Sequence, residues 1–230
     1  MTSGGADGLA LCLVSKLGAR WKLVLFDLDG TLVNTIDLIV QGFTHAYAEV
    51  LGTDIPRKKV LAFIGLTMPE VMAREAPQRA DELQASYYAY IAAHHDEMVH
   101  PYPGMVELVG ELAAHGVQTA VVTSKRVALA PPGLRSTGDP DTINVVSGME
   151  DTSRHKPDPE PLRAGLDKVG VDAREAVYIG DAIYDLQAAA AGPMDAVGVT
   201  WGAGDNAAMA DQHPLALVDS SAELRRVLLG

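Results

Sequence analysis

The sequence predicts an α/β fold: a Rossmann-like parallel sheet with helices on both faces and an inserted helical domain. The first observation behind this prediction is a set of short, continuous apolar runs separated by helix-like stretches. Strands of a parallel sheet are buried on both faces, so they read as unbroken apolar runs instead of alternating with polar residues. The expected strands are 22–26, 117–122, 143–146, 176–179 and 196–199, with 215–218 as an edge strand and 221–229 as a closing helix.

The second observation is an interval, from about residue 36 to residue 101, that breaks this alternation. It contains helix-like stretches at 38–51 and 78–98 and no convincing strand, which indicates an inserted helical bundle. Prolines and a glycine at 101–104 provide hinge chemistry at one junction. The predicted organisation is a flexible N-terminal extension at 1–19, a Rossmann-like core at 20–35 and 102–230, and the inserted helical domain at 36–101.

One segment of the predicted core is irregular. Residues 126–142 follow the second expected strand, where a helix is normal for this fold, but they contain Pro131 and Pro132. Proline in a helix interior removes a hydrogen bond and clashes with the preceding turn. We therefore expect that helix to be short or disturbed.

Composition excludes some classes of function. The chain has 230 residues, of which 48% are hydrophobic, and a formal charge of −12, which argues against broad nucleic-acid binding. The run Arg57-Lys58-Lys59 is interpreted as a solvated helix face. The single cysteine, Cys12, excludes an internal disulfide and fits a reducing, cytoplasmic location. The apolar segment 9–14 is too short to cross a bilayer, so no membrane association is expected; the sequence leaves the oligomeric state open.

The most informative local pattern is Asp27-Leu28-Asp29-Gly30-Thr31, which directly follows the first expected strand. If the strand continues through the two aspartates, both carboxylates face the same side. Two like charges in one place require a divalent cation or a shared proton, so the pair indicates either a metal site or an acid/base couple. A strand followed by a simple Asp-Gly turn is the structural alternative.

Further polar groups follow the later strands and supply partners for this pair. Thr123, Ser124 and Lys125 come after the second strand. Lys156 lies in a proline-stiffened loop, His155-Lys156-Pro157-Asp158-Pro159. After the strand at 176–179 come Asp181 and Asp185, which we expect to share one face of an Ala-rich helix near the positive end of its dipole.

These four motifs, each in order after an apolar strand, resemble the haloacid dehalogenase-like superfamily over roughly residues 21–225. Within it the chain is most similar to the phosphoglycolate phosphatase and pyrophosphatase group, through residues 26–33, Tyr102-Pro103-Gly104 and the loop from His155 to Pro161. Asn34 stands where the family often carries Asp, which we expect to alter the hinge more than the chemistry.

The resemblance implies a Mg²⁺-dependent phosphatase acting on small phosphorylated metabolites. Asp27 would be the nucleophile, forming an aspartyl-phosphate, and Asp29 the general acid and base. Mg²⁺ prefers oxygen ligands. The implied metal ligands are the carboxylates of Asp27 and Asp181 and the backbone carbonyl of Asp29, with Asp185 acting from outside the ligand shell. Lys156 would offset the negative charge. The implied phosphate-binding residues are Thr123, Ser124, Lys156 and Gly30, with Thr123 preferred over Ser124.

The resemblance also implies that the insert at 36–101 is a helical cap over the active site of a catalytic core. In this cap, Gly65, Leu66 and Thr67 resemble the family's substrate-facing loop, whereas Tyr87, Tyr88 and Tyr90 are expected to serve cap packing. A phosphoglycolate-like phosphomonoester is the favoured substrate. The alternatives are an inorganic pyrophosphatase, a sugar-phosphate mutase, an L-2-haloacid dehalogenase and a non-catalytic sensor. A dehalogenase would not need the metal, and Asp29 argues against it.

Overall fold

The computed structural model describes residues 20–135 and 143–230, so the predicted extension at 1–19 lies outside the described residues. Six strands form one sheet in the order β5-β4-β1-β6-β7-β8, and every neighbouring pair is parallel. The strands are β1 Leu23–Phe26, β4 Gln118–Val122, β5 Asn144–Ser147, β6 Ala176–Gly180, β7 Asp195–Val199 and β8 Ala216–Val218. The order reverses between β1 and β6, which is where ligands bind in open α/β sheets. The predicted Rossmann-like fold is confirmed.

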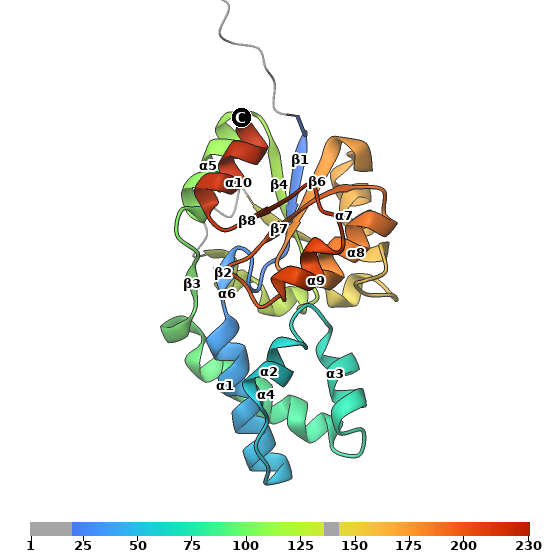
Figure 1. The fold of residues 1–230 in the computed structure, drawn as a ribbon. Helices are drawn as coiled ribbons and strands as arrows, with labels where there is room; N and C mark the ends of the chain where they lie inside the picture. The colour runs from blue at the N-terminus through green and yellow to red at the C-terminus, as the bar shows by residue number, and fades with distance from the viewer. Residues whose placement is uncertain (1–19, 136–142) are drawn as a thin grey trace, which may run out of the picture.

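Helices cover both faces of this sheet (Figure 1). In a strand, successive side chains point to opposite faces. Val24 and Phe26 therefore pack in the core cluster shared with α5 (Met105–Ala114) and α10 (Ser221–Leu229). Leu23 and Leu25 pack in the second cluster, with α7 (Glu160–Val169) and α8 (Ile183–Ala191). Burial on both faces explains why the strands appear in the sequence as continuous apolar runs. The short helix α9 (Asn206–Ala210) follows β7.

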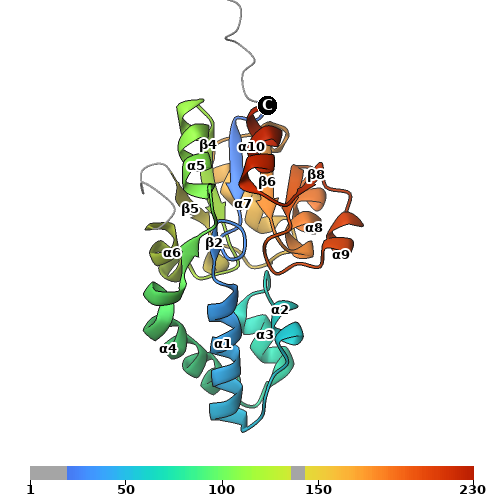
Figure 2. The ribbon, with the colours of Figure 1, turned by 60° about the vertical axis from the view of Figure 1, so that its left-hand side comes forward.

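The inserted interval folds as helices that extend from one end of the sheet (Figures 1 and 2). They are α1 Ile36–Ala46, continued by a π-helical turn at Tyr47–Leu51, then α2 Arg57–Leu61, α3 Met68–Glu75 and α4 Ala80–Met98. Two short strands that the sequence did not predict, β2 (Val33–Asn34) and β3 (His100–Pro101), pair antiparallel where the chain enters and leaves this region. Asn34 thus lies in the connection, opposite His100. The insert is helical as predicted, whereas its limits as a separate domain stay a prediction.

The helix in the irregular segment after β4 is short, as predicted. The segment contains a 3₁₀ turn at Val127–Leu129 and the five-residue helix α6 (Pro131–Arg135). The prolines stand in the first turn of α6, where no intrahelical N–H bond is lost, so they begin this helix instead of ending it. Residues 136–142, which complete the predicted irregular segment, lie outside the described residues.

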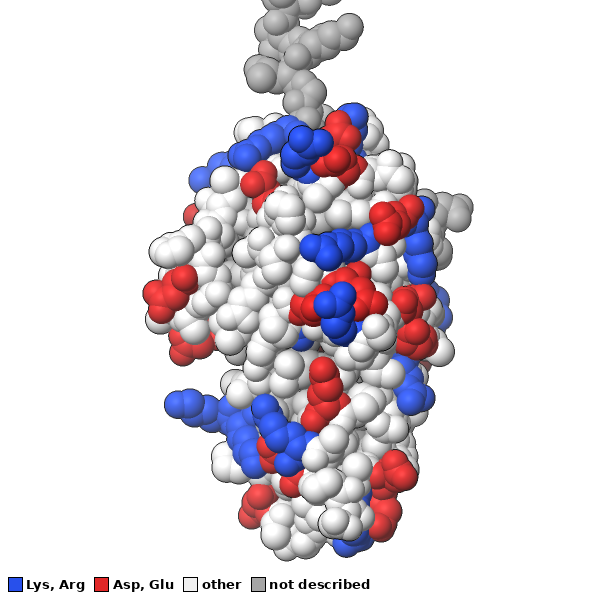
Figure 3. Space-filling view, turned by 90° about the vertical axis from the view of Figure 1, so that its right-hand side faces the viewer, with Lys and Arg blue, Asp and Glu red and all other residues white. Residues whose placement is uncertain are grey.

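Charged side chains of both signs lie on the face that Figure 3 presents. Acidic and basic side chains are interspersed there, without one large surface of a single sign. The run from Arg57 to Lys59 is exposed on α2, and ion pairs join Arg57 to Asp37 and Lys59 to Glu75. It is a solvated helix face, as expected. Within the described residues, no helix has the length and apolar character needed to cross a membrane.

Candidate active site

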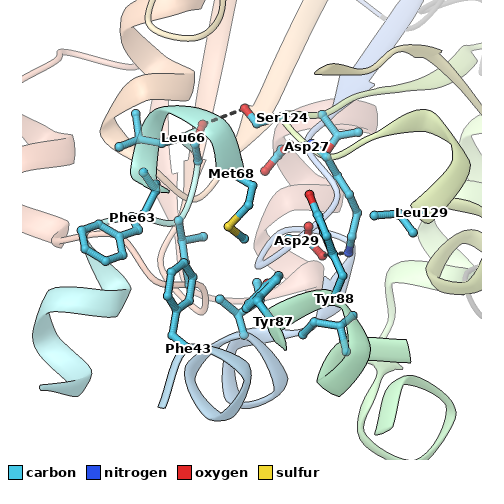
Figure 4. A pocket seen from close by; sticks show the side chains of 17 residues that line it. Asp27, Asp29, Phe43, Phe63, Leu66, Met68, Tyr87, Tyr88, Ser124 and Leu129 are labelled. Carbon is cyan, nitrogen blue, oxygen red and sulfur yellow. Dashed lines mark hydrogen bonds and ion pairs between the residues drawn. The ribbon is translucent and has the colours of Figure 1, made fainter. Parts of the chain in front are cut away.

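Asp27 lies where β1 ends, beside the end of β6. Its N–H donates to the Ile179 carbonyl (2.8 Å), and its side chain is almost fully buried. We expected both carboxylates to face the same side if the strand continued through Asp29. The strand does not continue that far. Instead β1 ends at Phe26, and the Leu28 carbonyl accepts hydrogen bonds from the N–H groups of Leu32 and Val33. This turn brings Asp27 and Asp29 into the lining of the same pocket (Figure 4).

Lys156 holds two of the predicted carboxylates together. Its Nζ donates to Asp27 Oδ1 (2.9 Å) and to Asp185 Oδ1 (2.8 Å), and all three side chains are buried. The other Asp185 oxygen accepts the Ala182 N–H (3.0 Å) at the start of α8. Burial alone would lower the pKa of Lys156, but the charges of Asp185 and Asp27 outweigh it and raise that pKa, so the ammonium stays protonated. Asp185 is therefore placed to orient Lys156.

Asp181 is fixed by contacts from two distant segments. Its Oδ1 accepts the Thr31 hydroxyl (2.9 Å), and its Oδ2 accepts the Ala203 N–H (2.8 Å). The helix α8 begins only at Ile183, so the expectation that Asp181 and Asp185 share a helical face is wrong. Asp181 lies in the connection between β6 and α8, while Asp185 lies in the first helical turn. The two still meet because the chain turns sharply between them.

Gly30 allows the close approach of Asp181. Its φ is +84°, and a Cβ at this position would overlap the Asp181 carboxylate. The Gly30 N–H donates to the Val33 carbonyl (2.9 Å) within the turn. The prediction that Gly30 binds phosphate does not match this geometry, because its donor is already used. Its place is explained by backbone conformation and by the space that Asp181 needs.

Asp27, Asp181 and Asp185 form a cluster that fits a metal ion. Each offers a carboxylate oxygen, and these atoms lie within 4.8 Å of one another. Desolvation raises the pKa of Asp27 to about 7 against the opposing charge of Lys156, and desolvation with the charges of Asp185 and Asp27 raises the pKa of Asp181 well above its ordinary value. Three buried carboxylates next to one lysine lack a positive charge that a divalent cation would supply. Oxygen ligands of this kind suit Mg²⁺; participation of the Asp29 carbonyl stays a prediction.

The Asp29 side chain has a partner that the sequence interpretation missed. Lys125 Nζ lies 2.8 Å from Asp29 Oδ1, and both side chains are less than one-fifth exposed. The signal was present, because Lys125 follows a strand end in the same segment as Thr123. A lysine soon after a strand usually faces solvent, however, and only the fold brings this one to Asp29.

Thr123 and Ser124 have different surroundings, which separates the two candidates. Thr123 is buried, lines the pocket beside Asp27, and accepts the Lys125 N–H (3.2 Å) at its hydroxyl oxygen, which leaves the hydroxyl proton free to donate. The Ser124 hydroxyl instead donates to the Gly65 carbonyl of the cap (2.7 Å), as the dashed line in Figure 4 shows. The geometry favours Thr123 as the phosphate donor and makes Ser124 a contact between core and cap.

The cap loop is only partly as predicted. Gly65 and Leu66 line the pocket. Thr67 does not belong to this lining: its hydroxyl donates to Glu70 Oε2 (2.6 Å), and its N–H donates to the same oxygen (3.0 Å). Thr67 is thus the first residue of a capping box that begins α3, and its assignment to the substrate loop is wrong. The pattern Thr67-Met68-Pro69-Glu70 was visible in the sequence.

The remaining cap wall is apolar and aromatic. Its main side chains come from α1, the loop before α3, α3 itself and α4: Phe43, Phe63, Met68, Tyr87, Tyr88 and Ile91. Tyr87 packs on Phe43 and Tyr88, with ring centroids 4.9 and 5.5 Å apart, as expected for cap packing, and both tyrosines also line the pocket, which the sequence did not indicate. Tyr90 also follows the packing expectation, because its ring stacks on His94 with centroids 4.1 Å apart. Desolvation raises the pKa of Tyr87 well above its ordinary value, so that hydroxyl stays neutral.

Together, the fold and this site define an α/β protein with a buried acidic centre beneath an inserted helical cap. The family model described as "Haloacid dehalogenase-like hydrolase" matches residues 24–199. The chain belongs to this family.

Individual relatives agree with that assignment. The chain is 36% identical to pyrophosphatase PpaX of Halalkalibacterium halodurans, over 71% of this chain and 76% of the relative. It is 34% identical to pyrophosphatase PpaX of Bacillus velezensis, over 79% of this chain and 84% of the relative. Among solved structures, a Lactobacillus plantarum protein named as a candidate phosphoglycolate phosphatase is 27% identical, with a TM-score of 0.79 over 90% of this chain and 99% of that chain. By name, these similar proteins are two pyrophosphatases and one candidate phosphoglycolate phosphatase.

Proposed function

We propose that this protein is a Mg²⁺-dependent phosphatase that hydrolyses small phosphorylated metabolites through an aspartyl-phosphate intermediate. The observation that carries the proposal is the position of Asp27, which is buried at a strand end, hydrogen-bonded to Lys156 and open to the pocket. A nucleophile in a phosphatase must be held still and have its charge offset, because phosphate esters resist attack. The same chemistry requires no membrane and fits the cytoplasmic location that the sequence favours.

In the proposed first step, a carboxylate oxygen of Asp27 attacks phosphorus and the bond from phosphorus to the leaving oxygen breaks. Asp29 donates a proton to that oxygen, so an alcohol departs. In the second step, Asp29 removes a proton from a water molecule, whose oxygen attacks phosphorus. The bond between phosphorus and Asp27 then breaks, releasing inorganic phosphate and restoring both carboxyl groups.

The remaining residues stabilise charge in both steps. Lys156 supplies a permanent positive charge next to Asp27, and Asp185 holds Lys156 in place. The Thr123 hydroxyl is free to donate to a phosphoryl oxygen. Lys125 orients Asp29 toward the pocket. When bound, Mg²⁺ would neutralise the phosphoryl charge; Asp27 and Asp181 would hold it, together with the Asp29 carbonyl.

Two finer possibilities concern the substrate. The sequence resemblance favours a phosphoglycolate-like ester, and the relatives named pyrophosphatase PpaX favour pyrophosphate as a second candidate. A sugar-phosphate mutase would use the same acidic centre, but it would yield isomerised product with little free phosphate.

The test is phosphate release from a panel of small phosphate esters and pyrophosphate, with Mg²⁺ and with a chelator. We expect activity only with Mg²⁺, and a loss of at least about 10³-fold in kcat for Asp27→Asn, as for removal of other catalytic nucleophiles. Asp37→Asn is the matched control, because Asp37 is an exposed acid of the cap. Turnover without metal, or full activity in Asp27→Asn, would overturn the proposal.

A further inference from the structure

The cap wall that faces Asp27 and Asp29 carries no charged side chain among the described residues. The cap residues that line the pocket are aliphatic, aromatic, methionine or glycine. Their polar side-chain groups are the hydroxyls of Tyr87 and Tyr88, and the raised pKa of each tyrosine keeps it neutral. In Figure 4, Met68, Tyr87 and Tyr88 lie on the cap side of the space that Asp27 and Asp29 also line.

The cations near the pocket are already engaged or face elsewhere. Of the described residues that line it, Lys125 is the one cation, and it is paired with Asp29. Two guanidinium groups lie over pocket rings, Arg74 at 5.2 Å from the Phe63 centroid and Arg126 at 5.8 Å from the Tyr88 centroid, yet neither residue belongs to the lining. A carboxylate or a second phosphate in this space would therefore lose its hydration without gaining an unpaired cationic partner from the described lining.

From this we infer that the substrate's leaving group is an uncharged, mainly apolar alcohol, seated against Phe43, Phe63 and Met68. The inference rests on the proposed phosphatase function and narrows its substrate class. The cavity has a volume of about 90 Å³, which suits a short branched alkyl group. Apolar surface removed from water on binding favours such a group. The preference for a phosphoglycolate-like ester is not supported by this wall, because glycolate is an anion.

The experiment compares two substrates of nearly the same shape. Isobutyl phosphate differs from 2-phosphoglycolate by an isopropyl group in place of the carboxylate. We expect kcat/KM for isobutyl phosphate to exceed that for 2-phosphoglycolate and for pyrophosphate by at least about tenfold, which is within the range that a hydrophobic pocket can discriminate. Acetyl phosphate, whose small acetyl group is uncharged in the substrate and makes little demand on the pocket, reports the phosphatase chemistry itself.

A charge-insertion variant tests the wall directly. Met68 is half-buried at the start of α3, where its side chain reaches the pocket. Met68→Lys should shift the ratio of the two kcat/KM values toward 2-phosphoglycolate by about tenfold or more, whereas Met68→Leu should preserve it. Met98→Lys adds the same charge at a half-buried cap methionine outside the pocket lining and should leave the ratio unchanged.

The outcomes separate the two proposals. Hydrolysis of acetyl phosphate combined with a preference for 2-phosphoglycolate or pyrophosphate would overturn the apolar leaving group and leave the phosphatase intact. An unchanged ratio in Met68→Lys would overturn it as well. Absence of Mg²⁺-dependent hydrolysis for every substrate, acetyl phosphate included, would remove the proposed function and with it this inference.

Discussion

The two walls of the pocket differ in how their chemistry is built. The core wall is polar: Asp27, Thr123 and Lys125 follow strand ends, and backbone hydrogen bonds of the sheet place them. The cap wall is apolar, and its side chains come from helices that meet only through packing, such as Phe43 and Tyr87, whose ring centroids lie 4.9 Å apart. A rigid sheet suits charges that must be held within a fraction of an ångström, whereas packed helices suit selection by shape. For the proposed phosphatase, this difference assigns the reaction to the core and the choice of substrate to the cap.

The largest expected effect separates a fully buried charge from one at the pocket edge. Lys156→Gln leaves Asp27 and Asp185 without their cation in a site that is almost completely buried. Breaking a buried pair from one side costs about 3–5 kcal/mol of unfolding free energy. Lys125→Gln is the matched change at the edge, where both partners keep some contact with water, and it should cost about 1 kcal/mol.

Urea denaturation of both variants in the presence of a chelator measures the difference. Mg²⁺ should recover part of the loss in Lys156→Gln, because it supplies positive charge to the same carboxylates. Equal losses of unfolding free energy in the two variants would contradict the expectation that the buried Lys156 pairs stabilise the fold more than the partly exposed Lys125 pair.

The second prediction concerns pH, with no metal bound. Burial raises the pKa of Asp27 from 3.8 to about 7, so between these values the folded state binds more protons than the unfolded state. A raised folded-state pKa gives stability that is complete below 3.8 and is lost as pH rises through about 7. From pH 6 to pH 8, linkage then predicts a loss of roughly 1.4 kcal/mol from Asp27, and the raised pKa of Asp181 acts in the same direction.

Chemical denaturation at pH 6 and pH 8 in chelator tests this prediction, with Asp27→Asn as the control whose slope should be smaller. Mg²⁺ should stabilise the protein more at pH 8 than at pH 6, because binding requires the deprotonated carboxylates. A chelated protein that gains stability over this interval would contradict the assigned direction.

The sequence predicted the buried acidic centre with its lysine much better than the apolar cap wall. Asp27, Lys156 and Asp181 could be placed because the carboxyl ends of parallel strands share one edge of a sheet, so polar groups after successive apolar runs must meet. The contact between Asp29 and Lys125 could not be placed, because it depends on turn geometry beyond the strand ends. The place of Tyr87 and Tyr88 in the pocket lining could not be predicted either, because the sequence pattern of a tyrosine on a helix is the same whether its ring faces a neighbour or a cavity.

Thr67 and Asp181 show two different errors of local interpretation. The spacing of Thr67 and Glu70 predicts a capping box, and this local hydrogen bonding, not the resemblance to a substrate loop, decides where the Thr67 side chain lies. For Asp181, the expected helical spacing to Asp185 fails because the helix begins only at Ile183, two residues after Asp181. Both errors lie at helix starts, where spacing in sequence does not yet fix direction in space.

The smallest expected effect lies where the two walls meet. The Ser124 hydroxyl donates to the Gly65 carbonyl, joining the core to the cap loop that carries Leu66. Ser124→Ala removes this hydrogen bond, worth about 0.5–1.5 kcal/mol, and should lower the population of the arrangement in which the cap lies over the pocket. KM for acetyl phosphate should rise by up to about tenfold while kcat changes less.

Ser86→Ala is the matched control, because the Ser86 hydroxyl bonds to Glu49 within the cap, so this variant should leave KM unchanged. A fall in kcat with constant KM in Ser124→Ala would instead make Ser124 a ligand of the phosphoryl group in the transition state. In that case Ser124 would belong to the polar core wall that acts on the phosphoryl group, and not to the contact between core and cap.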